Sequence, residues 1–85
     1  MDYNILYKES VKKDLRGIDK SGLRKIFTSI ESVLMTKPKT GKRLTGEFEG
    51  LYSIRAGDYR IVYSILKESV LILRIGHRKD VYRTK

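Results

Sequence analysis

The sequence contains no cysteine and a single histidine, His77. Without cysteine the chain forms no disulfide and offers no thiolate to a metal ion. One histidine does not provide the several nitrogen or sulfur ligands that a zinc ion requires. We therefore expect a protein that works without a metal or another cofactor. The lack of disulfides also fits a reducing cytoplasm.

Long apolar segments are also missing. No apolar run approaches the roughly 18 residues that would indicate a membrane-spanning helix. The first ten residues, MDYNILYKES, lack the basic and apolar regions of a secretory signal. We expect a soluble, cytoplasmic protein that makes no contact with a membrane. Its 85 residues are enough for one small domain, residues 1–85, built around one hydrophobic core.

Acidic residues are scarce, because 10 Asp and Glu face 19 Lys and Arg, for a net charge of +9. In a domain of this size the excess predicts a polyanionic partner, either nucleic acid or an acidic protein. A basic surface that only keeps the protein in solution is the alternative. The bases are concentrated in residues 37–43, KPKTGKR, with four bases and no acid, and in residues 74–85, with five bases and one acid. These two segments are the expected edges of an anion-binding surface.

The first half of the chain predicts one strand and two helices. Alternation over residues 3–7 predicts a short, half-buried strand. Apolar residues at helical spacing predict a first helix from an N-cap at Ser10 to Gly17. A second helix is expected from the N-cap Asp19 until Pro38, which cannot extend a helix. Its core-facing stripe consists of Leu23, Ile26, Phe27, Ile30, Val33 and Leu34.

The second half predicts strands at residues 51–56, 59–66 and 70–77, because each run is rich in β-branched or aromatic residues and is bounded by Gly, Asp or Ser. The expected fold class is α+β. A short N-terminal strand and an α-helical hairpin precede an antiparallel sheet of three further strands and a short C-terminal tail.

A two-residue turn at residues 57–58 fixes the expected pairing of the first two of these strands. It sets Ile54 opposite Ile61 on the core face, and Arg55 opposite Arg60 on the other face.

For the second hairpin, matching of the core faces predicts an odd loop, residues 67–69. This register pairs Tyr63 with Leu73 and Ile65 with Leu71, so that Leu71 and Leu73 point into the core.

The sheet face away from the helices is expected to carry the charge. There Gly76 lies opposite Arg60, and Arg74 lies one pair further along. Two like charges opposite each other, as Arg55 and Arg60 are, destabilise a sheet by a few tenths to about 1 kcal/mol, so a bound anion is expected beside them. Guanidinium groups suit phosphate, and a glycine permits close approach of a nucleotide. An ordinary solvent-facing sheet with scattered arginines is the alternative.

Three motifs carry a family resemblance that covers nearly the whole chain. They are GKRLTGEFEGLY at the entrance to the sheet, LYSIRAGDYRIVYSI in the first hairpin, and RIGHRKDVYR at the C-terminal end. Together they resemble the RelE/ParE superfamily of toxins from toxin–antitoxin systems, and in particular the RelE-type messenger-RNA endonucleases.

The resemblance implies a small α+β domain whose sheet cradles messenger RNA in the ribosomal A site and cuts it without a metal. In such enzymes the ribose 2′-hydroxyl attacks the adjacent phosphate and leaves a 2′,3′-cyclic phosphate and a 5′-hydroxyl. This chemistry requires a base, stabilisation of the phosphorane charge, and an acid at the leaving oxygen.

The family's catalytic positions are carried over to matching residues. Arg60 is expected to grip the scissile phosphate, Arg78 to stabilise the transition-state charge, and Tyr82 to orient the substrate base. Arg55 and Ser53 stand where RelE has lysines. Because the pKa of arginine stays above about 12, Arg55 is expected to act as an electrostatic stabiliser and not as a base.

The general base is left open by the sequence. His77 is a candidate because its unperturbed pKa lies near 6.5, although strand alternation places it on the core face, opposite Tyr59. Glu47 and Glu49 in the preceding loop are further candidates. Contact with RNA is expected from Lys37, Lys39, Lys42, Arg43, Ser53, Arg74 and Lys79.

The expected partners are the ribosome, messenger RNA and a small, partly acidic, RelB-like antitoxin encoded next to the toxin. Two alternatives remain. A ParE-like toxin would inhibit DNA gyrase without cleaving RNA. A degenerate toxin would only bind its antitoxin, and the missing lysines at positions 53 and 55 favour that possibility.

Overall fold

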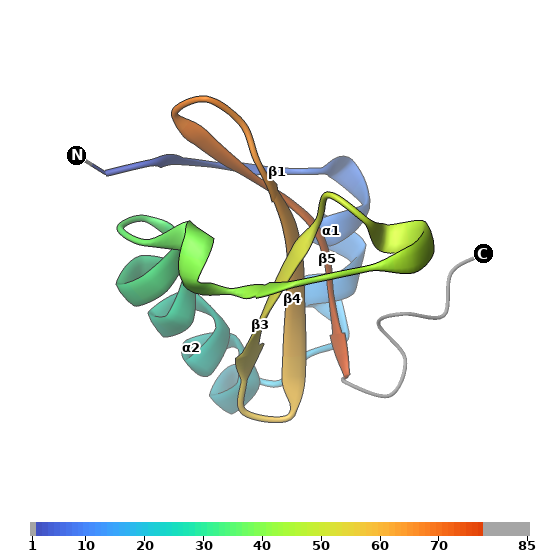
Figure 1. Cartoon of the computed structure of the whole chain (residues 1–85). Helices are drawn as coiled ribbons and strands as arrows, with labels where there is room; N and C mark the ends of the chain where they lie inside the picture. The colour runs from blue at the N-terminus through green and yellow to red at the C-terminus, as the bar shows by residue number, and fades with distance from the viewer. Residues whose placement is uncertain (1, 78–85) are drawn as a thin grey trace.

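The protein is described by a computed structural model over residues 2–77, in which helices and strands follow one another as shown in Figure 1. Two α-helices come early, and the second continues into a short π-helix, Ile30–Leu34. Short 3-10 turns, Pro38–Thr40 and Gly46–Phe48, flank the second strand. The main elements are β1 (Asn4–Tyr7), α1 (Glu9–Arg16), α2 (Lys20–Ser29), β2 (Lys42–Arg43), β3 (Tyr52–Ala56), β4 (Tyr59–Ile65) and β5 (Ser69–His77).

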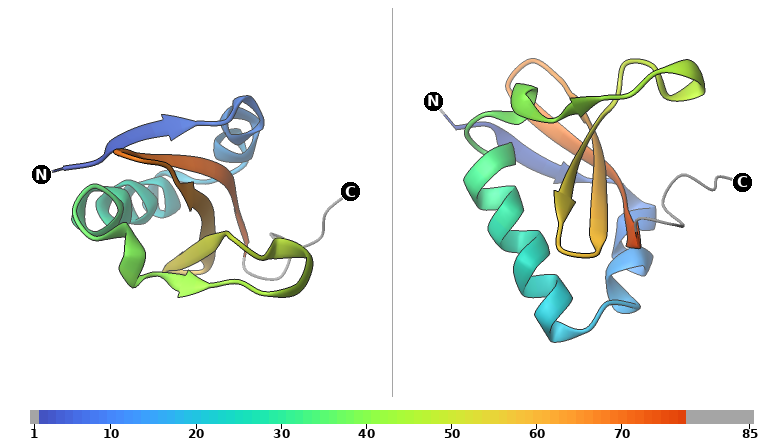
Figure 2. Two further views of the ribbon diagram at one scale, coloured as in Figure 1. Left: turned by 45° about the horizontal axis from the view of Figure 1, so that its top comes forward. Right: turned by 60° about the horizontal axis from the view of Figure 1, so that its bottom comes forward.

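The strands form one mixed sheet in the order β1-β5-β4-β3-β2. β1 runs parallel to β5, and the other neighbours are antiparallel. The sheet is strongly twisted, and the two helices form a V beside it (Figure 2). The α+β architecture is as predicted. The sheet gains one strand beyond the prediction, because β2 has two residues and is recognisable only through its pairing with β3.

Among residues 2–77, no helix has the length and apolar character that crossing a membrane requires.

The helices cover the sheet with the predicted apolar stripe. Asp19 caps α2, where its carboxylate accepts a hydrogen bond from the backbone N–H of Gly22 at 2.9 Å. Two details of the helix prediction are wrong. Phe27 is 39% exposed, and it lines an apolar hollow beside Tyr7 and Leu15 and does not enter the core. The helix α1 begins at Glu9 after Lys8, without a side-chain cap from Ser10.

The β3–β4 hairpin has the predicted register. Ile54 faces Ile61, and Arg55 faces Arg60 across a turn in which Gly57 has φ 66°. A positive φ of this kind is adopted readily by glycine and only with strain by most other residues. The turn therefore fixes which side chains of both strands enter the core.

The β4–β5 hairpin differs from the prediction because β5 contains a bulge. Arg60 faces Gly76 as expected, but the register shifts between Val62 and Tyr63, so that Tyr63 faces Ile72. The predicted pairing of Tyr63 with Leu73 is wrong, because Leu73 is the extra residue on β5.

The turn of this hairpin is correspondingly shorter than predicted. The backbone N–H of Leu66 donates to the carbonyl of Ser69 at 2.8 Å, and Ile65 faces Val70, where Leu71 was expected. As a result Val70 and Ile72 are buried in the N-terminal half of β5, where Leu71 and Leu73 were expected. Alternation fails there because the bulge reverses which residues face the core.

Tyr63 links the sheet to the basic segment that precedes β2. Its side chain is fully buried, and its hydroxyl donates to the carbonyl oxygen of Pro38 at 2.6 Å. The backbone of Gly41 passes so close that a Cβ there would collide with this hydroxyl. The hydrogen bond holds the start of this segment against the core face of the sheet.

Replacement of Gly41 by alanine tests this close approach. The added Cβ would meet the Tyr63 hydroxyl and would lie 3.1 Å from both Ile54 Cγ2 and the Ser53 carbonyl oxygen. We expect Gly41→Ala to lower the free energy of unfolding by about 2 kcal/mol, measured by urea denaturation. Gly17→Ala is the control, because the nearest atom there is 3.9 Å away and φ is −90°. Equal stability of the two variants would contradict the proposed contact.

Alkaline titration tests the burial of Tyr63. Burial, with a smaller contribution from Tyr52, raises the pKa of Tyr63 from 10.0 to about 12. The unfolded chain loses this proton near pH 10 and the folded chain near pH 12, so stability is complete below pH 10 and falls as the pH rises to 12. We expect ionisation of the Tyr63 hydroxyl to lower the unfolding free energy of the wild type by up to about 3 kcal/mol over this range. Tyr63→Phe has no ionisable hydroxyl and should not show this part of the loss when the unfolding free energy is measured by urea denaturation at each pH. If the unfolding free energies of the two proteins fall in parallel between pH 10 and 12, the raised pKa of Tyr63 is refuted.

Candidate RNA-binding face of the sheet

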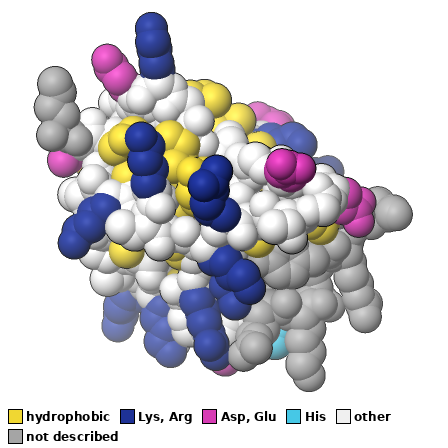
Figure 3. Space-filling model, viewed as in Figure 1, with side chains coloured by type: hydrophobic (Ala, Val, Ile, Leu, Met, Phe, Trp, Pro, Cys, Tyr) yellow, Lys and Arg dark blue, Asp and Glu magenta, His cyan; other side chains and the backbone are white. Residues whose placement is uncertain are grey.

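Two cross-strand rows of side chains occupy the sheet face opposite the helices. The first row contains Lys42, Ser53, Val62 and Arg74, one residue from each of β2, β3, β4 and β5. The second row contains Arg55, Arg60 and Gly76. We call these seven residues the basic face. Figure 3 shows lysine and arginine side chains gathered around the end of the molecule that carries the β3–β4 turn.

Arg55 and Arg60 lie opposite each other, yet their side chains point in opposite directions along the strands. The Arg55 Nε donates to the carbonyl oxygen of Gly57 at 3.4 Å, toward the turn. The Arg60 Nη1 donates to the hydroxyl of Ser53, also at 3.4 Å, away from the turn. This divergence separates two guanidinium charges that the register would otherwise bring together. Arg55 is exposed, whereas Arg60 is partly buried.

Ser53 lies in the middle of the basic face and is only 1% exposed. It was predicted to contact RNA. Its burial leaves almost no surface for such a contact.

Arg74 is engaged by an acidic residue that the sequence did not point to. Asp14 on α1 places its Oδ2 3.7 Å from Arg74 Nε and accepts a hydrogen bond from the backbone N–H of Ile75 at 3.0 Å. That N–H belongs to the part of β5 beyond its pairing with β1, which ends at Ile72. Asp14 therefore satisfies a strand-edge donor and holds a cation of the basic face.

The basic segment divides between the two faces of the sheet. Lys42 belongs to the basic face, and Lys37 and Lys39 are exposed just before it. Arg43 is the next residue of β2 and therefore points to the opposite face. Its guanidinium carbon lies 6.0 Å from the centre of the Tyr52 ring, a cation–π distance.

Lys25 of α2 was not predicted to be near the site. Its aliphatic chain lies against the β3–β4 turn, with Cδ 2.9 Å from the position of a Cβ on Gly57. The helix thereby adds one cation to the end of the hairpin that carries Arg55. Helical periodicity marks Lys25 only as exposed, so the sequence offers no signal for this contact.

The candidate bases lie outside the basic face. His77 is exposed at the end of β5, opposite Tyr59, with the two rings in edge contact at 6.0 Å. This is the predicted position. Glu49 lines a hollow of about 400 Å³ with Arg43 and Tyr52, and Glu47 is exposed in the preceding turn. The predicted catalytic residues Arg78 and Tyr82, and the RNA-contact residue Lys79, lie outside the described residues.

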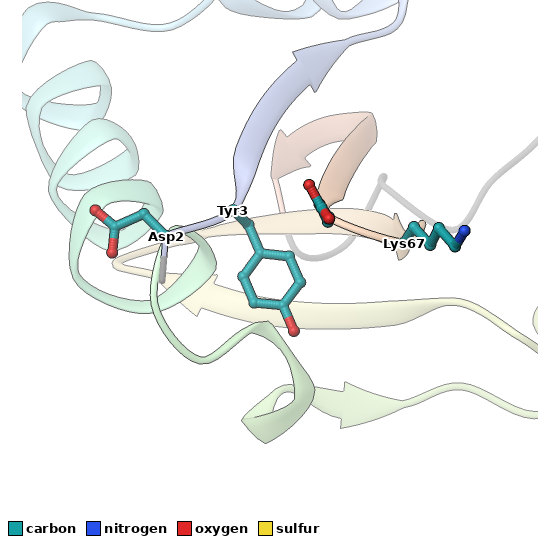
Figure 4. Close-up of a pocket in the computed structure, with 4 residues that line it drawn as sticks. Asp2, Tyr3 and Lys67 are labelled. Atoms are coloured by element: carbon teal, nitrogen blue, oxygen red, sulfur yellow. The ribbon is translucent and has the colours of Figure 1, made fainter.

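Two further observations concern possible ligand sites elsewhere. Within residues 2–77, no group of three or more His, Asp or Glu residues is arranged to hold a metal ion. A hollow of about 200 Å³ lies between the N-terminal segment and the β4–β5 turn, lined by Asp2, Tyr3, Lys67 and Glu68 (Figure 4). It lies beside the end of β5 that is remote from Arg74 and Gly76.

Comparison with known proteins decides the family. A family model described as "ParE toxin of type II toxin-antitoxin system, parDE" matches residues 5–82. The chain belongs to the RelE/ParE toxin superfamily. Its members are toxins of type II toxin–antitoxin systems, and the resemblance seen in the sequence motifs is thereby confirmed.

Individual relatives of this RelE/ParE toxin point toward the RelE branch. Toxin RelG of Mycobacterium tuberculosis is 34% identical over 86 aligned positions, which cover 98% of this chain and 99% of the relative. Toxin RelE of the same organism is 31% identical, and the alignment covers 95% of this chain and 87% of that relative. The solved toxin–antitoxin complex RelBE2 from M. tuberculosis has a chain with TM-score 0.79 and 29% identity, covering 92% of this chain and 100% of that one.

Two substitutions of Asp14 separate its contribution as a hydrogen-bond acceptor from the contribution of its charge. Asp14→Ala removes the acceptor for the Ile75 N–H and the partner of Arg74, and we expect it to cost about 1–3 kcal/mol of unfolding free energy. Asp14→Asn keeps an oxygen acceptor and should cost less. Glu9→Ala breaks only the exposed pair with Lys12, 3.6 Å apart, and should change stability by less than about 0.5 kcal/mol. Chemical denaturation measures all three, and an equal loss for Asp14→Asn and Asp14→Ala would show that the backbone contact contributes nothing.

Proposed function

We propose that this RelE/ParE toxin is a ribosome-dependent endoribonuclease that cleaves messenger RNA in the A site without a metal ion and so inhibits translation. The observation that carries the proposal is the arrangement of Arg55 and Arg60, two guanidinium groups on facing strands that diverge around one spot of the basic face. A phosphate bound at this spot would lie between two cationic side chains, and its negative charge would offset their mutual repulsion.

In the proposed reaction the ribose 2′-oxygen attacks the neighbouring phosphorus, and the bond from phosphorus to the 5′-oxygen breaks. The base takes the proton of the 2′-hydroxyl, and the departing 5′-oxygen gains a proton. The products are a 2′,3′-cyclic phosphate and a 5′-hydroxyl. Arg60 binds the scissile phosphate, and Arg55 stabilises the negative charge that builds up on the phosphorane oxygens. By family resemblance, Arg78 shares that role and Tyr82 orients the substrate base.

His77 is the proposed base or a contributor to proton transfer, because its position at the end of β5 lies close in sequence to both Gly76 of the basic face and Arg78. Lys37, Lys39 and Lys42 extend the positive surface along the β2 edge, where they would contact the RNA backbone. Binding should weaken as salt rises, in proportion to the number of phosphates contacted.

The proposed protein partner is an acidic RelB-like antitoxin. The solved relative RelBE2 is a toxin–antitoxin complex, and a net charge of +9 favours an acidic partner. An antitoxin segment that covers the basic face would compete directly with RNA.

Inhibition of DNA gyrase is the second candidate function, and the description of the matching family as ParE toxins favours it. In that case the basic face would serve stability or binding and not catalysis.

Primer extension on a defined messenger with programmed ribosomes tests the two functions. We expect cuts within A-site codons by the wild type and a loss of about 100-fold or more in the cleavage rate for Arg60→Ala. Arg24→Ala removes the same charge from an exposed position of α2 and should remain within about twofold of the wild type. The same proteins are assayed for inhibition of gyrase supercoiling. Gyrase inhibition by folded wild type that makes no cuts would replace the nuclease proposal with the ParE-like one.

A further inference from the structure

Ser53 is a polar residue enclosed on a face that is otherwise rich in long cationic side chains. It is 1% exposed, and its cross-strand neighbours are Lys42 on β2 and Val62 on β4. Arg60 is its diagonal neighbour on β4, and the Arg60 guanidinium reaches back over the serine to place Nη1 3.4 Å from the hydroxyl oxygen. A buried hydroxyl in such a position is available to the protein and almost unavailable to a ligand.

The Arg60 side chain could point in either of two directions along the strand, so the direction that it takes requires an explanation. One direction leads toward the β3–β4 turn, where the Arg55 guanidinium already binds the Gly57 carbonyl. In that direction the two like charges would approach each other. The other direction leads over residue 53, and only a small side chain there leaves room for the arginine to lie along the sheet. Serine provides both the room and an acceptor.

We infer that Ser53 is a positioning residue that holds the Arg60 guanidinium away from Arg55 and fixes it on the basic face before substrate arrives. The inference rests on the proposed function only for its catalytic consequence, since the placement of Arg60 concerns the free protein. Ser53 itself does not touch the RNA. A pre-ordered guanidinium stabilises the transition state without having to be ordered during the reaction.

The placement is tested first without any activity measurement. The amide-like Nε–Hε signal of Arg60 is followed by ¹⁵N relaxation in the free protein, in wild type, Ser53→Ala and Ser53→Cys. We expect its order parameter to fall by about 0.2 in Ser53→Ala, and by less in Ser53→Cys, which keeps the size of the side chain with a weaker acceptor. Ser64→Ala, a half-buried serine of β4, is the matched control and should leave the Arg60 signal unchanged.

The catalytic consequence is then measured as the single-turnover rate on programmed ribosomes. We expect Ser53→Ala to slow cleavage by about 3- to 10-fold, with thermal unfolding unchanged and with unchanged affinity for an RNA that carries a 2′-deoxy group at the cleavage site. Ser64→Ala should cleave at the wild-type rate.

The outcomes separate the inference from the proposed function. An Arg60 signal equally ordered in wild type and Ser53→Ala overturns the inference, whatever the activity. A looser Arg60 in Ser53→Ala, together with a wild type that makes no cuts, supports the positioning role and rejects the nuclease proposal. A looser Arg60 with an unchanged cleavage rate overturns the catalytic part of the inference.

Discussion

The pairing of β3 with β4 is the constraint on which the rest of the molecule depends. The turn at Gly57 fixes this register, because its φ of 66° is one that glycine adopts without strain. Once Ile54 faces Ile61, the helices have a continuous apolar surface to cover, and Arg55 and Arg60 must face each other on the opposite side. A shift of one residue would exchange the two faces, placing arginine in the core and isoleucine in solvent. Core packing and the charge on the basic face are therefore set by the same turn.

The arginine pair illustrates how a sheet accommodates a costly arrangement. Two guanidinium groups are brought opposite each other by the register, and each is drawn away by a different acceptor, the Gly57 carbonyl or the Ser53 hydroxyl. Arg74 is balanced instead by a carboxylate from α1, Asp14. The three arginines of the basic face thus have three different local partners. An arriving phosphate would meet a surface whose cations are already separated and oriented.

The sequence predicts those features that depend on short-range rules. Turn chemistry gave the β3–β4 register, side-chain alternation gave the pairing of Arg55 with Arg60, and capping by Asp19 gave the start of α2. These short-range rules fail for features that depend on contacts between segments far apart in the sequence. The bulge at Leu73 reverses alternation within β5, and a two-residue β2 exists only because β3 pairs with it. Asp14 was missed because an acidic residue of a short helix has no local pattern that reveals a contact with a distant strand.

The position of β1 bears on how this protein comes to be folded. The first strand of the chain finds its only described sheet partner in the last one, with Asn4 beside Ser69 and Tyr7 beside Ile72. Contacts between such distant segments form late in folding, because a long loop must close first. During synthesis β5 emerges well after β1, so β1 must wait for it before the two strands can pair. The edge of the sheet formed by β1 is therefore completed only after β5 has been synthesised.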